Sequence, residues 1–155
     1  MAIDIGSPAT DRPAHLTGDF TEIMVDNPAN ATGTITQIEI WCYLNTTGIE
    51  VGTFYGSGTT YTNRDSAAIE SVTSGSKQTF AGLSIDVEVG DYIGWHLTSG
   101  AIEGAETGFG GLYDIDGNQM GTGPQTYTFY DGYASSVYGT GTEAIRQHMQ
   151  PKRFW

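Results

Sequence analysis

Basic residues are scarce in this chain: Lys and Arg together number 6, against 18 Asp and Glu, and the formal net charge is −12. A surface of that sign repels the phosphate backbone of nucleic acids and anionic membranes, so we expect neither as a partner. The same charge serves solubility and keeps strand-rich proteins from associating edge to edge. The acidity therefore excludes classes of partner without indicating an activity.

Leucine is also rare, with 5 residues in 155, whereas Ile and Val together number 19. Long helices draw on Leu, Lys, Arg, Glu and Ala, so this supply excludes a mainly helical bundle. β-branched and aromatic residues between 22 glycines favour short strands joined by tight turns. The length is that of one domain with a full core.

The chain has one cysteine, Cys42, which excludes an intrachain disulfide. Its neighbours Trp41 and Tyr43 are apolar, which predicts a buried rather than a reactive thiol. The sequence starts without the basic residues and apolar run of a secretory signal, and no apolar stretch is long enough to span a membrane. We therefore expect the protein to be made and folded in a cytosol.

Alternating apolar residues predict most of the strands. The clearest is 34–43, in which Ile38, Ile40 and Cys42 share one face. Segments 83–89 and 92–98 alternate on either side of Gly90-Asp91 and predict a hairpin. Further strands are expected at residues 3–5, 20–25, 49–55, 77–80, 125–130 and 134–138, and turns at 26–30, 45–48, 116–117 and 131–132.

About eight to ten short strands with frequent turn signals predict an all-β fold. We favour a two-sheet antiparallel β-sandwich of jelly-roll type over a closed barrel. The predicted organisation is an N-terminal strand and extended arm over residues 1–19, irregular from Gly6 to Gly18, then the sandwich domain over 20–142. A basic and aromatic C-terminal tail follows over 143–155.

The tail is the one abrupt change in composition. Residues 1–145 hold 18 acidic and 3 basic residues, a charge of −15, whereas residues 146–155 (RQHMQPKRFW) hold three basic and no acidic residues, a charge of +3. Cations beside anchoring aromatics are enriched at binding hot spots. We expect this segment to dock on an acidic surface of a second copy or of another structural protein; packing onto its own body and disorder are the alternatives. The expected partner-binding residues are Arg146, His148, Met149, Lys152, Arg153, Phe154 and Trp155.

Catalytic and metal-binding patterns are weak. His15, His96 and His148 lack a second histidine or cysteine at metal-ligand spacing. Asp114, Asp116 and Asn118 resemble part of a calcium loop, but a hairpin turn explains them better. We predict no catalytic residue, no cofactor and no metal, and hence no enzyme. Binding of a carbohydrate is the alternative function, because Trp41, Trp95 and Tyr113 offer rings for a sugar-binding platform, although core packing explains rings of this kind as well.

Four runs carry a resemblance to a known family: NPANATGTITQIEIW (27–41), VGTFYGSG (51–58), GSKQTFAGLSIDV (75–87) and GDYIG (90–94). Together they resemble a β-sandwich family found in tailed bacteriophages and environmental viral genomes, over residues 20–142. The resemblance implies a virion component: a capsid decoration protein, a head fibre or a tail appendage. It implies a virion location, a major capsid or other virion protein as partner, and a homo-oligomer. The shared motifs are turn glycines and core positions, so the resemblance transfers no functional residue.

Overall fold

The computed structural model describes residues 2–145, and all regular structure in that range is antiparallel strand. The predicted all-β, sandwich-like fold is confirmed. No helix in the described range is long and apolar enough to cross a membrane. The strands are β1 (Ala2–Gly6), β2 (Ala14–Thr17), β3 (Phe20–Met24), β4 (Gly33–Ser57), β5 (Thr60–Val72), β6 (Lys77–Phe80), β7 (Ile85–Val87), β8 (Tyr92–His96), β9 (Ser99–Asp116), β10 (Gln125–Thr126), β11 (Thr128–Ser135) and β12 (Val137–Glu143).

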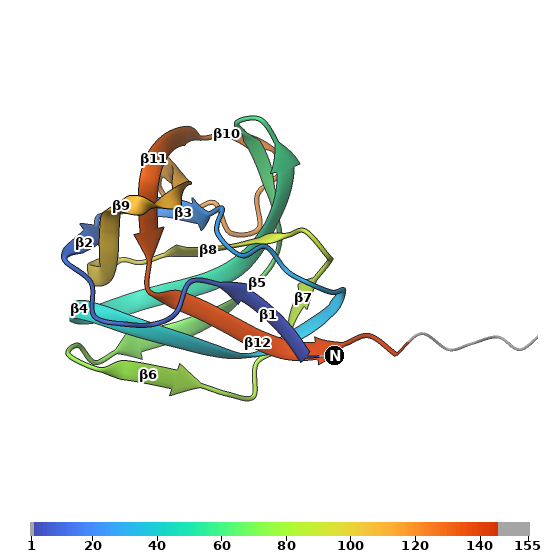
Figure 1. Cartoon of the computed structure of the whole chain (residues 1–155), viewed down its shortest axis with the longest axis horizontal. Coiled ribbons are helices and arrows are strands. Elements are labelled where there is room, and N and C mark those ends of the chain that lie inside the picture. Colours follow the sequence, from blue (N-terminus) through green and yellow to red (C-terminus); the bar gives the residue numbers. More distant parts are fainter. Residues whose placement is uncertain (1, 146–155) are drawn as a thin grey trace, which may run out of the picture.

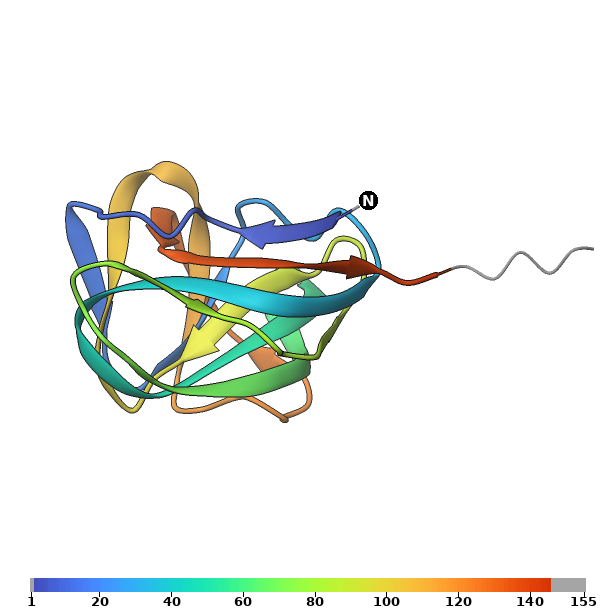
Figure 2. The ribbon, with the colours of Figure 1, turned by 90° about the horizontal axis from the view of Figure 1, so that it is seen from below.

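Strand β4 belongs to both layers of the sandwich (Figures 1 and 2). Its first part pairs with β12, β6 and β7 in one sheet, and β1 extends that sheet beyond β12. Its second part pairs with β5 and β8 in the other sheet, which β3, β9 and β11 continue. The predicted turn at 45–48 is wrong, because β4 continues through it with irregular pairing as it passes between the layers.

Alternation along β4 builds the core as predicted. Ile38, Ile40 and Cys42 are fully buried, and Trp41 on the other face is half-buried. Ile35 is also fully buried despite its odd spacing from Ile38, because the pairing with β12 shifts by one residue between them. Burial raises the pKa of the Cys42 thiol, which fits the buried, unreactive cysteine expected from the sequence.

The predicted hairpin around Gly90-Asp91 is wrong. Strand β7 pairs with β4 in the first sheet, whereas β8 pairs with β3 and β4 in the second. Apolar and polar residues alternate in both segments because each strand packs one face against the shared core. Ile85 and Val87 reach this core from one layer, and Ile93 and Trp95 reach it from the other. Alternation reveals the buried face of a strand and not its pairing partner.

The second sheet curls until its ends meet. Strand β11 pairs with β9 at one end, while β10, one residue earlier in the chain, pairs with β5 at the other. The curl encloses a second, aromatic core around Ile23, Phe54, Tyr61 and Tyr127. The predicted turn at 131–132 is instead an irregularity within β11, where Gly132 takes a positive φ of 83°.

The N-terminal residues are part of the sheets. The predicted strand at residues 3–5 is confirmed as β1, which pairs with β12. The segment predicted to be irregular, Gly6 to Gly18, contains β2, which pairs with β9. Pro8 and Pro13 flag the irregular part correctly, but β2 is short and half-exposed, so it lacks the apolar alternation that identifies a strand.

Candidate functional site

The predicted partner-binding segment, Arg146 to Trp155, lies outside the described residues. Its point of departure is well defined. Strand β12 lies between β1 and β4, and just beyond it the Ala144 amide donates a hydrogen bond to the Thr32 carbonyl at 2.9 Å. The segment therefore starts from a fixed point at the end of an inner strand.

The three rings predicted as a sugar-binding platform do not come together. Trp95 is 0 % exposed in the main core, where its Nε1 donates a hydrogen bond to Ser135 Oγ at 2.9 Å, so its assignment to a surface platform is wrong. Tyr113 lies on β9 against the aromatic core, 4.7 Å from the ring of Tyr61. Trp41 is half-buried in the other sheet. Trp95 alternates in phase with the buried residues of its strand, so its ring packs in the core and not on the surface.

A groove of about 540 Å³ lies over β1 and the start of β12. Its volume is in the range of small-ligand sites. We call it the acidic groove. Its polar and aromatic lining consists of Asp4, Ser7, Asp26, Asn27, Glu39, Phe109 and Tyr138.

Asn27 organises the floor of the groove. It lies in the turn that follows β3 and has a left-handed φ of 52°, a conformation that Asn tolerates better than most residues. From there its Nδ2 donates hydrogen bonds to Asp4 Oδ1 at 2.9 Å and to the Gly6 carbonyl at 3.1 Å. The Tyr138 hydroxyl donates to Asp4 Oδ2 at 3.2 Å, and burial and the Asp4 charge together raise the Tyr138 pKa. Asp4 is thus held as an oriented carboxylate.

The other two carboxylates come from different segments. Both oxygens of Asp26 accept from the Gly110 amide at 3.0 Å, which ties the turn after β3 to β9. Glu39 lies on β4, 3.8 Å from Lys77 on β6, a loose ion pair on a partly exposed surface. Three carboxylates around one hollow favour a cationic ligand.

One guanidinium already sits beside the groove. Arg12 places its guanidinium carbon 4.8 Å from the centre of the Phe109 ring, and its Nε donates to Ser136 Oγ at 2.8 Å. Partial burial lowers the Arg12 pKa. The Phe109 ring is therefore a surface on which a cation packs in this protein.

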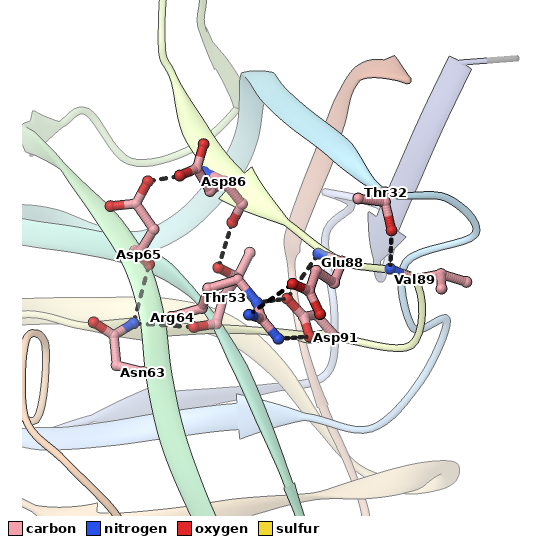
Figure 3. Close-up of polar contacts among 9 residues, drawn as sticks. All are labelled: Thr32, Thr53, Asn63, Arg64, Asp65, Asp86, Glu88, Val89 and Asp91. Atoms are coloured by element: carbon pink, nitrogen blue, oxygen red, sulfur yellow. Dashed lines mark hydrogen bonds and ion pairs between the residues drawn. The ribbon is translucent and has the colours of Figure 1, made fainter. Parts of the chain in front are cut away.

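A second polar cluster surrounds Arg64 on β5 (Figure 3). Pairing of β4 with β5 shifts between Thr53 and Phe54, so Arg64 is an extra residue that the bulge aims at the loop after β7. Its Nε and Nη2 donate to the two carboxylate oxygens of Asp91 at 2.6 and 3.0 Å, and Nη1 lies 3.3 Å from Glu88. Asp91 is 3 % exposed, so this pair joins β5 to the loop between the layers and is structural.

The segment that resembles a calcium loop is divided between a strand and a turn. Asp114 and Asp116 lie at the end of β9, and Gly117 makes the predicted turn with a positive φ of 79°. Asn118 Nδ2 donates to Glu50 Oε1 at 3.1 Å. Among residues 2–145, no three His, Cys, Asp or Glu side chains are grouped to hold a metal ion.

Sequence reasoning missed a buried acid, Glu22 on β3. It stands directly opposite Asp114 on β9 and Trp95 on β8, and within the described chain its Oε2 has no hydrogen-bond partner. Burial, with a contribution from the Asp114 charge, raises the pKa of Glu22 to about 8. The signal in the sequence was an acid flanked by residues of a buried strand, Thr21 and Ile23.

Comparison with protein-family models finds no match to this chain, and comparison with curated proteins finds no significant relative.

Proposed function

We propose that this protein is a structural component of a virus particle, a capsid decoration protein or a head-fibre or tail appendage. It attaches by protein–protein contacts through residues 146–155 and carries out no catalysis. The resemblance of residues 20–142 to a virion β-sandwich family supports this role.

The observation that carries the proposal is the separation of charge along the chain. A body of −15 is followed by a ten-residue segment of +3 that contains Phe154 and Trp155. That segment starts where β12 ends, at a point fixed by two neighbouring strands.

Deletion of residues 146–155 is expected to abolish attachment and to leave the body folded, because the strands and cores of the described residues are built without that segment. Co-sedimentation with particles that lack the protein measures attachment, and circular dichroism with thermal unfolding measures folding. A full-length control, Lys152→Arg with Arg153→Lys, keeps the charge and should attach normally. Normal attachment of the truncated chain would overturn the proposal.

The alternative function is carbohydrate binding, and one observation favours it: an aromatic pair on β11 in which Tyr130 is exposed and Tyr133 is half-buried. The Tyr130 ring is 40 % exposed and lies 5.7 Å from the ring of Tyr133. Exposed rings of this kind stack on sugar faces. If the alternative holds, a glycan array detects a ligand whose binding is lost in Tyr130→Ala and kept in Tyr43→Ala, which removes another exposed ring, one that stacks on His15. No binding at millimolar sugar would exclude it.

A further inference from the structure

We propose that the acidic groove binds residues 146–155 of a second copy, so that each copy places its basic and aromatic segment on its neighbour. The inference rests on the proposed function, in which this segment is the protein-binding element. It adds the surface that receives the segment and the identity of the partner.

The chemistry of the two surfaces is complementary. The groove presents carboxylates from Asp4, Asp26 and Glu39, and the segment carries Arg146, Lys152 and Arg153. The groove also presents the rings of Phe109 and Tyr138, and Phe109 is 36 % exposed. Phe154 and Trp155 of the segment are apolar side chains that can pack against these rings and remove them from water.

Arg12 shows how such a ligand packs. Its guanidinium lies over the Phe109 ring, and its Nη2 donates to the Pro8 carbonyl at 2.8 Å at the edge of the groove. Asp26 already attracts the Arg12 guanidinium, so the carboxylates of Asp4 and Glu39 are the ones that face a second cation approaching from solvent. The groove therefore combines cation–π and charge-assisted contacts in one place.

Strand geometry favours a second copy over the same chain. Tyr138, in the groove, pairs with Gly6 and Glu39 at the start of β12, whereas Thr142 pairs with Ala2 and lies at the far end. The described chain therefore ends, at residue 145, on the side away from its own groove. To return, a ten-residue segment would have to reverse and use about 20–25 Å of the roughly 33 Å that it can span, so that only its last few residues could reach the groove of its own chain.

The direct return path is also occupied. The outer edge of β1 is already hydrogen-bonded: the Asp4 amide donates to Asn30 Oδ1 at 3.0 Å, and Asn30 Nδ2 donates to the Ala2 carbonyl at 3.1 Å. Further along this edge, Asn27 Nδ2 donates to the Gly6 carbonyl. The segment therefore does not add to this edge as a further strand. A neighbouring copy beyond the end of β12 receives the whole segment, in a head-to-tail contact.

Zero-length carbodiimide cross-linking of the full chain tests the inference, because Lys77 and Lys152 are its only lysines. In an equal mixture of ¹⁵N-labelled and unlabelled protein, Lys152 should link to Asp4, Asp26 or Glu39 in peptides that combine both isotopes. The Lys77–Glu39 pair, 3.8 Å apart, is the internal control and should link within one isotope. Three outcomes would overturn the inference. Lys152 links could be confined to one isotope, or they could go to other carboxylates such as Asp86 and Glu88. The third is the absence of any Lys152 link when the control link forms.

A pair of variants gives the second readout. Asp4→Asn with Glu39→Gln removes two charges from the groove and should weaken self-association by about tenfold in sedimentation equilibrium. Asp86→Asn with Glu88→Gln makes the same change outside the groove and should leave self-association unaltered. Equal effects of the two pairs would contradict the inference. Particle co-sedimentation tests the proposed function separately. If deletion of residues 146–155 abolishes attachment but Lys152 does not cross-link to the groove, the proposed function stands and the groove is rejected as the binding site.

Discussion

Replacing Glu22 by Gln is expected to remove most of the pH dependence of stability between about pH 4.5 and about pH 8. Burial raises the pKa of Glu22 from 4.5 to about 8, so the folded protein holds a proton over this interval that the unfolded chain releases. Stability from this group is therefore fully present below pH 4.5 and is lost as the pH rises through 8. A shift of that size corresponds to about 4–5 kcal/mol of unfolding free energy.

The two proteins should therefore differ most under alkaline conditions. Gln is a neutral side chain of nearly the same shape, so the variant should match the wild type near pH 4.5 and exceed its stability by several kcal/mol above pH 8. Asp114 contributes in the same direction, because burial and the Asp116 charge raise its pKa also, and its contribution remains in the variant. Urea unfolding at a series of pH values measures the effect.

The matched control is Glu106→Gln, the same chemical change at an exposed position of β9. It should leave the pH dependence as in the wild type. A Glu22→Gln variant whose unfolding free energy follows the wild-type curve across this range would show that Glu22 titrates normally, and the buried position would then need another explanation.

The sequence predicted the strands that bury apolar side chains at every second position. Ile38 and Ile40 on β4, and Ile93 on β8, identify their strands because a regular ladder with one wet face leaves that pattern. Strands β5 and β9 were missed, although β9 has 18 residues. Gly, Ala and Thr supply much of β9, and its pairing with β11 shifts twice, so neither side-chain size nor spacing marks its buried face.

The acidic groove was beyond sequence reasoning for a different reason. Its lining comes from β1 and the loop after it, from the turn after β3, and from β4, β9 and β12. Asp4 and Tyr138 are 134 residues apart. Only the pairing of β1 with β12 brings these two together, and local patterns do not encode pairing. The Trp95 error has the same origin, because alternation placed it on one face of β8 without saying that the main core covers that face.

Arg64→Ala is expected to destabilise the protein by about 3 kcal/mol, because it leaves the buried Asp91 carboxylate without its cation. Asp91 would keep a hydrogen bond from the Glu88 amide at 3.0 Å but lose both guanidinium contacts. The guanidinium also packs 4.4 Å from the centre of the Tyr55 ring, so the substitution removes that contact too. Guanidinium chloride unfolding monitored by Trp fluorescence measures the change.

Two further variants separate the pair from the general loss of a surface cation. Lys77→Ala breaks the exposed ion pair to Glu39 and should cost less than about 1 kcal/mol. Asp91→Ala should lower the free energy of unfolding less in the Arg64→Ala background than in the wild type. The ion pair is already lost in that background, so removing Asp91 cannot break it a second time. A cost for Arg64→Ala no greater than that for Lys77→Ala would mean that water solvates Asp91 once the arginine is gone. In that case the loop between β7 and β8 is held by main-chain contacts to the connection between β3 and β4, such as the hydrogen bond from the Ala29 amide to the Asp91 carbonyl at 2.9 Å, and not by this ion pair.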